Sequence, residues 1–121
     1  MLNLDTHILL HALAGSLKPK ERRILSRETW GISAIVRWEI CKLCQLGRIR
    51  LDLDLPDVKR IIGRIHTWPL DWEVCRMSCD LDVAADPADE LIAATSVVHD
   101  VPLVTRDRRL RRSRMVPLAA I

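Results

Sequence analysis

The sequence has 121 residues, 49% of them hydrophobic and 29% charged, and its 19 Lys and Arg against 16 Asp and Glu give a formal net charge of +3. This length fits one domain, residues 1–121, the composition excludes a disordered chain, and the small net charge identifies no partner. No run of about 18 apolar residues is present, and Asp5 stands where a secretory signal would carry positive charge. We therefore expect a cytoplasmic protein with no membrane segment.

The first part of the chain predicts strands that lead directly into helices. Apolar runs with turn signals predict strands at 1–5 and 29–33. Helical spacing of apolar residues predicts helices at 6–15, 18–28 and 34–47. Gly15 and Gly47 are expected to end the first and third of these helices, and Ser33 is expected to cap the third at its N-terminus.

The second part continues the alternation. Residues 48–55 are either a short strand or an extended loop. Further helices are expected at 56–68, 73–85 and 86–99, the last with Asp86 as N-cap and Pro87 in its first turn. Further strands are expected at 69–72 and 101–105, with 115–121 as a candidate to close the sheet. Strands that alternate with helices predict a three-layer α/β/α domain with a central, mainly parallel sheet.

Four acids are expected at one edge of that sheet. Asp5 ends the first strand, Asp107 follows the strand 101–105, and Asp89 lies in the first turn of the helix that leads to this strand. In open parallel sheets functional groups collect beyond the carboxyl ends of the strands. Glu39 shares a helix face with apolar residues, so its carboxylate is expected to point inward.

Each acid also has a purely structural interpretation. Asp86 fits an N-cap, and Glu90 beside Asp89 fits the favourable interaction of acids with a helix N-terminus. Asp5 could cap the first helix and Asp107 could be a turn residue, while Glu39 could pair with Lys42. These interpretations do not explain why acids far apart in sequence are expected together. Buried carboxylates need a cation, and carboxylate oxygens suit Mg²⁺ or Mn²⁺.

Basic residues gather near the C-terminus. The stretch RDRRLRRSR contains Arg106, Arg108, Arg109, Arg111, Arg112 and Arg114. Clustered arginines suit contact with a polyphosphate. The alternatives are a solvated polar face or a surface that meets an acidic protein.

The motifs together resemble a known family. NLDTHILLHAL, ISAIVRWEICKLCQLGRI and DPADELIAATSVVHDVPLVTRD follow, in order and spacing, the motifs of PIN-domain proteins. The closest likeness is to the VapC-type toxins of bacterial toxin–antitoxin pairs, and it covers nearly the whole chain. Glu90 departs from the pattern, because many family members carry Arg at this position.

The resemblance implies an α/β/α fold with a parallel sheet and an endoribonuclease that depends on one or two Mg²⁺ or Mn²⁺ ions. It also implies a cognate antitoxin as partner, and homodimers. Carried over residue by residue, the catalytic and metal-binding acids are Asp5, Glu39, Asp89 and Asp107. Thr6 and Thr105 occupy the supporting positions beside the first and last of these acids.

Our hypothesis is therefore metal-assisted hydrolysis of RNA phosphodiester bonds. The cations expected to hold the RNA backbone are those of the C-terminal tail, Arg106, Arg108, Arg109, Arg111 and Arg112, together with Lys18, Lys20, Arg22 and Arg23. An alternative is a catalytically silent scaffold that retains the fold for binding. A phosphoacceptor receiver domain fits less well, because NLDTH holds one acid and arginines replace the Lys expected after the last strand.

Overall fold

A four-stranded sheet with parallel pairing throughout organises the structure, a computed structural model that describes residues 1–121. The strands are β1 (Leu2–Leu4), β2 (Trp30–Ser33), β3 (His66–Trp68) and β4 (Leu103–Val104). Their order in the sheet is β3-β2-β1-β4, so the chain starts near the middle and later adds a strand at each edge. The carboxyl ends of all four strands therefore meet at one edge.

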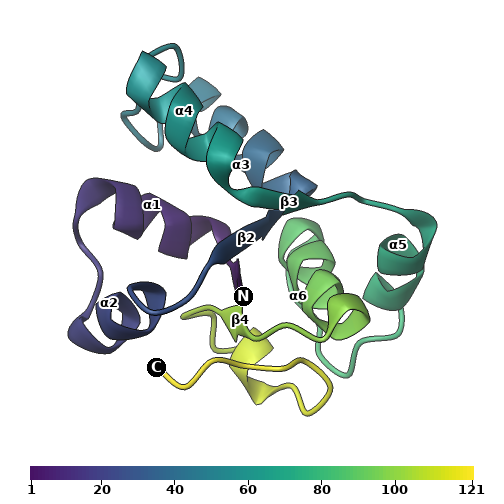
Figure 1. The fold of residues 1–121 in the computed structure, drawn as a ribbon. Coiled ribbons are helices and arrows are strands. Elements are labelled where there is room, and N and C mark those ends of the chain that lie inside the picture. Colours follow the sequence, from purple (N-terminus) through teal and green to yellow (C-terminus); the bar gives the residue numbers. More distant parts are fainter.

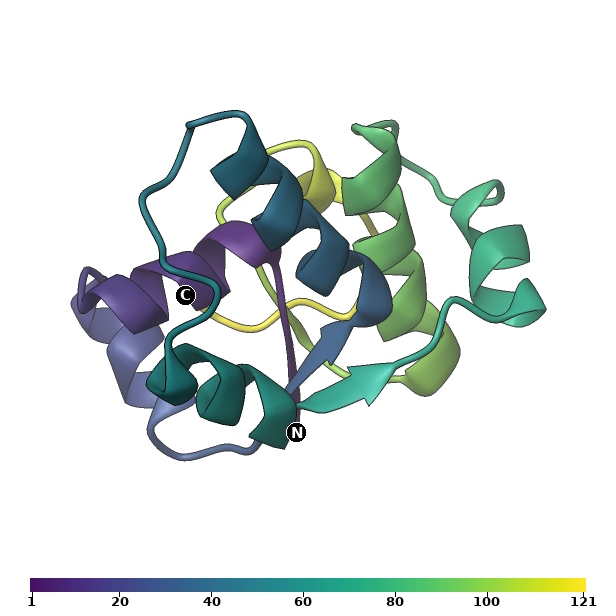
Figure 2. The same ribbon diagram turned by 90° about the horizontal axis from the view of Figure 1, so that it is seen from above.

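Helices cover both sides of this sheet. They are α1 (Thr6–Ala14), α2 (Pro19–Leu25), α3 (Ala34–Gln45), α4 (Pro56–Arg64), α5 (Trp72–Ser78) and α6 (Pro87–His99), followed by a 3₁₀ helix at Leu110–Arg112. Figures 1 and 2 show α1 and α2 on one side of the sheet and α5 and α6 on the other. The expected three-layer α/β/α architecture is confirmed. No helix is both long enough and apolar enough to span a membrane.

Local signals fix both ends of α1 and α3 as the sequence predicts. Asp5 accepts a hydrogen bond from the backbone N–H of Thr6 at 2.8 Å, and Ser33 Oγ accepts one from Ile35 at 3.3 Å. Gly15 and Gly47 follow α1 and α3 with φ of 71° and 70°, a left-handed conformation that favours glycine. The chain can therefore turn sharply after each helix.

Helix α6 lies close on the sheet because its inner face is built from small residues. Ala93 and Ala94 are fully buried. The buried Asn3 side chain of β1 reaches across and donates through Nδ2 to Ile92 O at 3.0 Å and to Ser96 Oγ at 2.9 Å. These contacts fix the position of α6, and with it the position of the acids in its first turn.

The prediction for residues 56–85 was wrong in three places. The fourth helix ends at Arg64 and not at residue 68, the third strand is His66–Trp68 and not 69–72, and α5 ends at Ser78 instead of continuing to residue 85. The reason lies in tertiary packing. The β3 strand pairs with β2, and the Trp68 ring lies over Gly31, where an added Cβ would come within 2.5 Å of the ring. Helical periodicity alone could not show this contact.

The structure also decides the two segments for which the sequence left the presence of a strand open, 48–55 and 115–121. Residues 48–55 form a loop with no strand. Residues 115–121 add no strand to the sheet, because only an isolated parallel bridge joins Leu118 to Leu103. Backbone hydrogen bonds from Leu103 N to Pro117 O and from Ala119 N to Leu103 O still hold this segment against β4. The C-terminal segment thus packs against the edge of the sheet where β4 lies.

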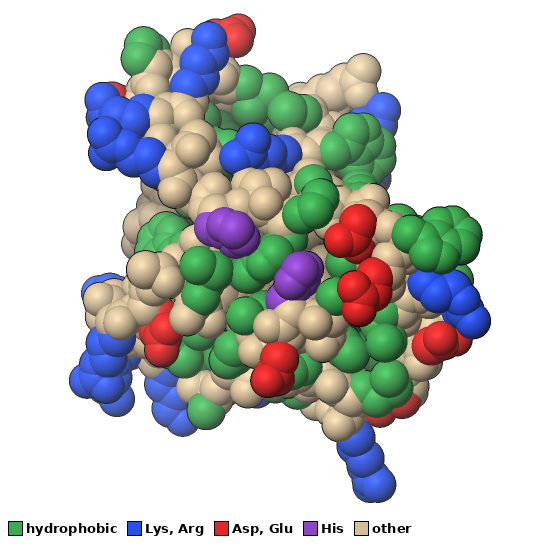
Figure 3. All heavy atoms as spheres, turned by 45° about the vertical axis from the view of Figure 1, so that its right-hand side comes forward, with side chains coloured by type: hydrophobic (Ala, Val, Ile, Leu, Met, Phe, Trp, Pro, Cys, Tyr) green, Lys and Arg blue, Asp and Glu red, His purple; other side chains and the backbone are tan.

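The apolar core lies between the sheet and its helices, while several large apolar side chains stay outside. Leu4, Ile8 and Ile32 are fully buried, whereas Trp38 and Trp72 are 56% and 82% exposed. Figure 3 shows one face on which hydrophobic side chains surround two histidines, with Lys and Arg mostly toward the rim. The chain therefore leaves apolar surface on α3 and α5.

Candidate functional site

An acid-lined hollow lies where the carboxyl ends of the central strands meet the first turn of α6. We call this hollow of about 420 Å³ the acid cleft. It is lined by Asp5, His7, Ile8, His11, Asp86, Asp89, Arg106, Asp107 and Arg109. Three of the four acids expected at this edge of the sheet line it directly.

Asp5 is the most buried of these acids. It ends β1, is 5% exposed, and accepts hydrogen bonds from Thr6 N at 2.8 Å and from Thr105 Oγ1 at 2.6 Å. Burial raises the pKa of Asp5 above its usual range, although both hydrogen bonds act in the opposite direction. The sequence places Asp5 here by ending an apolar strand with the residue that also caps α1.

Asp107 is held by the turn that follows β4. Its backbone N–H donates to Thr105 Oγ1 at 3.0 Å, and its Oδ1 accepts from Arg109 N at 2.8 Å and Leu110 N at 3.3 Å. Burial alone would raise the pKa of Asp107, but hydrogen bonds from Arg109 and from these backbone groups lower it overall. Thr105 thus connects Asp5 and Asp107 through a single hydroxyl group.

Asp89 is the least satisfied acid of the cleft. Its side chain is 17% exposed, and its nearest cation, Arg109 Nη2, is 3.6 Å from its Oδ2. Burial, followed by the charges of Asp5, Glu39, Asp107 and Asp86, raises the pKa of Asp89 from 3.8 to about 7. Such a shift records a concentration of negative charge that the protein's own cations do not balance.

Glu39 lies beside the cleft and does not line it. It projects from α3, is partly buried, and accepts a hydrogen bond from Thr6 Oγ1. Thr6 therefore links the first two expected acids, since its N–H donates to Asp5 and its hydroxyl to Glu39. The alternative pairing of Glu39 with Lys42 is absent, because Lys42 Nζ donates to Gln45 Oε1 at 2.8 Å.

Arg109 enters the acid cleft from the C-terminal tail. Its Nη2 lies 3.1 Å from Asp107 Oδ2 and 3.6 Å from both Asp86 Oδ2 and Asp89 Oδ2. The side chain is 48% exposed, so water screens these attractions. Arg109 was expected to contact RNA, whereas in the structure it contacts three carboxylates.

Arg106 forms one wall of the cleft and is held rigidly. Its Nε and Nη2 each donate to Glu21 at 2.6 Å, and Nη1 donates to His11 Nε2 at 3.0 Å. Because Nε2 accepts, His11 must be neutral, with its proton on Nδ1 facing Ser16 Oγ at 2.7 Å. Burial and then the neighbouring Arg106 lower the pKa of His11, in agreement with this arrangement. His11 is therefore a support for Arg106.

The cleft's donor set suits a hard cation by its chemistry. It offers carboxylate oxygens from separate elements, which Mg²⁺ and Mn²⁺ prefer, and Asp89 accepts no hydrogen bond from a neutral donor. No three His, Cys, Asp or Glu side chains surround one point closely enough to hold a metal. Threonines and Arg109 engage several of the oxygens instead. Arg109 would therefore compete with a metal ion for the oxygens of Asp89 and Asp107.

Three features of the site were not predicted. Asp86 occupies the N-cap position of α6, but its side chain makes no capping bond and lies 3.6 Å from Arg109. The pair between Glu21 and Arg106 joins residues 85 positions apart, so no local pattern could indicate it. Arg108, Arg111 and Arg112, expected to bind RNA, lie outside the cleft.

Solved structures share this architecture over almost the whole chain. The crystal structure of VapBC2 from Rickettsia felis bound to a DNA fragment from their promoter aligns with a TM-score of 0.74, 18% identity and 98% coverage of both chains. FitAcB from Neisseria gonorrhoeae aligns with a TM-score of 0.69 and 23% identity, covering 99% of this chain and 97% of that one. These identities show a shared fold.

Sequence comparison gives a narrower assignment. Ribonuclease VapC22 from Mycobacterium tuberculosis is 34% identical over an alignment of 86 residues. The alignment covers 69% of this chain and 66%, just under two thirds, of that protein. The family model of the PIN domain matches residues 3–114, a span that contains every helix and strand described above except Leu2, the first residue of β1. Since that match covers most of the chain and every residue that lines the acid cleft, the chain belongs to the PIN-domain family.

Proposed function

We propose that this chain is a metal-dependent endoribonuclease and the toxin of a toxin–antitoxin pair, with residues 1–121 acting as one domain. The observation that carries the proposal is the acid cleft, where carboxylates from separate elements meet and where burial, followed by the other carboxylates, raises the pKa of Asp89 to about 7. The name of the relative Ribonuclease VapC22 supports RNA as substrate. Complexes such as the toxin–antitoxin complex from Klebsiella pneumoniae, with a TM-score of 0.71, support the toxin role.

In this proposal one or two Mg²⁺ or Mn²⁺ ions are held by Asp5, Asp89 and Asp107, with Glu39 beside them. When bound there, such an ion would supply a bound water of lowered pKa and would offset negative charge on the leaving oxygen. Thr105 holds Asp5 and Asp107 in position, and Thr6 does the same for Asp5 and Glu39. The protein's own contribution is a rigid arrangement of oxygens.

The chain's cations provide the contact with RNA in this proposal. Arg106 and Arg109 line the cleft, while Arg108, Arg111 and Arg112 lie further along the same tail. Arginine donates to phosphate through a planar fork of N–H groups, so it suits the negatively charged backbone. Backbone contacts contribute affinity and carry little sequence information.

A protein partner is also part of the proposal. An antitoxin and a second copy of this chain both need apolar surface, and the exposed Trp38 and Trp72 supply some on α3 and α5. The structural relatives from Rickettsia felis and Salmonella typhimurium are both VapBC proteins bound to DNA. A cytoplasmic location agrees with this role.

Cleavage of a mixed RNA pool tests the function directly. We expect wild-type protein to cut RNA with Mg²⁺ or Mn²⁺ and to stop with EDTA. We expect Asp89→Asn to lose at least about 100-fold in rate, because removing residues that merely support metal ligands already costs 10- to 100-fold. Circular dichroism would check that the variant keeps its fold.

Asp54→Asn is a matched control, because Asp54 is exposed in the loop 48–55, outside the acid cleft. It should cut at the wild-type rate. Cleavage that survives EDTA, or an equal loss in both variants, would contradict the proposal. A folded wild type that cuts no RNA with either metal would favour the alternative, a binding scaffold without catalysis.

A further inference from the structure

Two more hollows continue from the acid cleft along α2 and the C-terminal tail. The first, of about 620 Å³, shares Arg106 with the cleft. The second, of about 710 Å³, shares Lys20, Arg111 and Ile121 with the first. Because they share lining residues, the three hollows lie next to one another along the surface of the protein.

The two added hollows are lined by cations without acidic partners. No carboxylate lies within ion-pair distance of Lys18, Lys20, Arg23, Arg27, Arg108 and Arg111. The two acidic side chains that line these hollows are both already paired. Glu21 binds Arg106 at 2.6 Å, and Glu28 binds the amino group of Met1 at 3.0 Å. The positive charge of both hollows is therefore available to an external anion.

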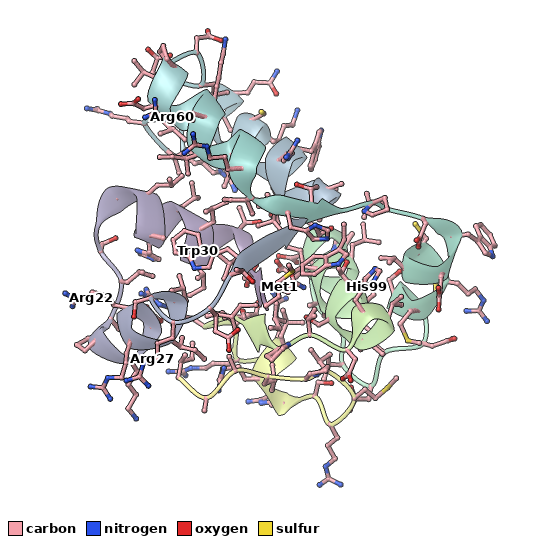
Figure 4. The ribbon with its side chains drawn as sticks, in the orientation of Figure 1. Met1, Arg22, Arg27, Trp30, Arg60 and His99 are labelled. Atoms are coloured by element: carbon pink, nitrogen blue, oxygen red, sulfur yellow. The ribbon has the colours of Figure 1, made fainter.

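The cations that line the two hollows come from two segments of the chain. One wall is formed by residues 18–27, which include α2, and the other by the segment 105–111. Figure 4 labels two arginines of the α2 region, of which Arg27 lines the second hollow and Arg22 lines neither. Arg111 is fixed on the second wall, because its Nη1 donates to Thr105 O at 3.1 Å and to Ala119 O at 3.5 Å. Its remaining N–H groups stay free to bind.

We propose that these two hollows form a phosphate track that binds the backbone of the RNA strand on one side of the bond to be cut. The choice of RNA rests on the proposed function, because the track leads through Arg106 into the acid cleft. Several of the unpaired cations are arginines, which suit phosphate. An acidic peptide offers similar charge, but it has no phosphodiester on which a metal ion held in the acid cleft would act.

Only some of the basic residues in this part of the sequence line the phosphate track. Arg112 and Arg22 are exposed but line neither hollow, whereas Arg27 lines the second one. The residues that contact RNA in this proposal are therefore those whose side chains line the two hollows between α2 and the C-terminal tail. A basic tail acting by charge alone would use all of its arginines equally.

Binding without cleavage tests the track. The probe is a fluorescently labelled single-stranded RNA of 12 nucleotides and mixed sequence, with EDTA present, and fluorescence anisotropy reports its affinity. The test variant is Lys20→Ala/Arg23→Ala/Arg108→Ala. The matched control is Lys42→Ala/Lys59→Ala/Arg64→Ala, which removes the same charge from exposed positions on α3 and α4.

We expect the test variant to lose about tenfold in affinity and to reduce the slope of log affinity against log salt by about 2, since each single-strand phosphate contact contributes about 0.7. The control should change affinity less than twofold. Equal losses in test and control would show an effect of net charge only and would overturn the track. An unchanged affinity in the test variant, or no binding by wild type, would do the same.

A peptide of 12 glutamates distinguishes RNA from an acidic protein. We expect it to displace the labelled RNA much less well than unlabelled RNA does. Equal displacement would overturn the proposal in favour of a site for acidic protein segments. Because EDTA prevents metal-dependent cutting, track-dependent RNA binding by a protein that never cleaves would support the track and contradict only the nuclease proposal.

Discussion

The acid cleft and the phosphate track are neighbours, but they hold their charges in opposite ways. In the cleft, Asp5 and Asp107 are buried or partly buried and are fixed by hydrogen bonds through Thr105. In the track, Lys20 and Arg108 are exposed and bind no carboxylate. The difference teaches that groups proposed for chemistry are positioned by a hydrogen-bond network, whereas groups proposed for affinity need only line the same groove.

Arg106 belongs to both regions, and its removal should give the largest loss of stability. Arg106→Ala leaves Glu21, only 2% exposed, as a buried carboxylate without its partner. We expect the free energy of unfolding to fall by about 2–3 kcal/mol at pH 7, below the full value for a buried pair because Arg106 is partly exposed. Urea denaturation measures this change.

The pH dependence gives the control for this prediction. Hydrogen bonds from Arg106 lower the pKa of Glu21 below its ordinary 4.5, so the pair stabilises the fold above that pH and less as pH falls. The difference between wild type and Arg106→Ala should therefore shrink in acid. A difference of the same size at pH 3 and pH 7 would contradict an electrostatic origin.

The contribution of Asp89 to stability should change with pH in the opposite direction from that of Glu21. Its pKa is raised from 3.8 to about 7, so the folded state binds a proton more tightly than the unfolded state does. This group then reduces stability progressively as pH rises from about 4 to 7. We expect Asp89→Asn to be more stable than wild type by on the order of 2 kcal/mol at pH 8, and by almost nothing at pH 4.

Thermal unfolding in metal-free buffer between pH 4 and pH 8 measures this stabilisation. Asp54→Asn, which changes an exposed acid in a loop, should not reproduce it. If Asp89→Asn lost stability at pH 8, the carboxylate would already be balanced in the fold, and the cleft would hold less excess negative charge than its geometry indicates.

The smallest expected effect concerns Arg109, which places a positive charge inside the acid cleft. Its guanidinium lies 3.1–3.6 Å from three carboxylates and competes with any metal for the same oxygens. We expect Arg109→Ala to bind Mn²⁺ about fivefold more tightly, because the substitution removes a competing cation whose solvent-exposed ion pairs are individually weak. Isothermal titration calorimetry measures the affinity without any RNA.

Arg108→Ala provides the matched control, since Arg108 is exposed and lines no part of the acid cleft. Its Mn²⁺ affinity should stay close to that of wild type. Weaker binding by Arg109→Ala would mean that this arginine organises the carboxylates instead of competing for them.

The sequence predicted the parts of this molecule that depend on local signals. Asp5 at a strand end, Ser33 as N-cap and Gly15 after α1 all lie where expected, because each effect acts within a few residues. The location of Asp89 followed from the helix start at Pro87. Parallel strands then bring the acids to one edge whatever their separation in sequence.

What the sequence could not predict depends on contacts between distant segments. The β3 strand was missed because Trp68 needs the open space above Gly31, a fact of sheet pairing. The turn toward Arg109 and the pairing of Glu21 with Arg106 depend on how the C-terminal tail returns beside α1 and α2. Charge density in a linear sequence does not show which arginines find partners.

The guanidinium of Arg106 limits how the sequences of this chain's relatives can diverge. It lines both the acid cleft and the first hollow beside it, and it depends on Glu21, 85 positions away in the sequence. A substitution at either position disturbs the acid cleft, the neighbouring hollow and the fold at once, whereas a joint replacement by two apolar residues would cost the fold little. Positions 21 and 106 should therefore covary among homologues, while Lys20 and Arg108 should drift independently.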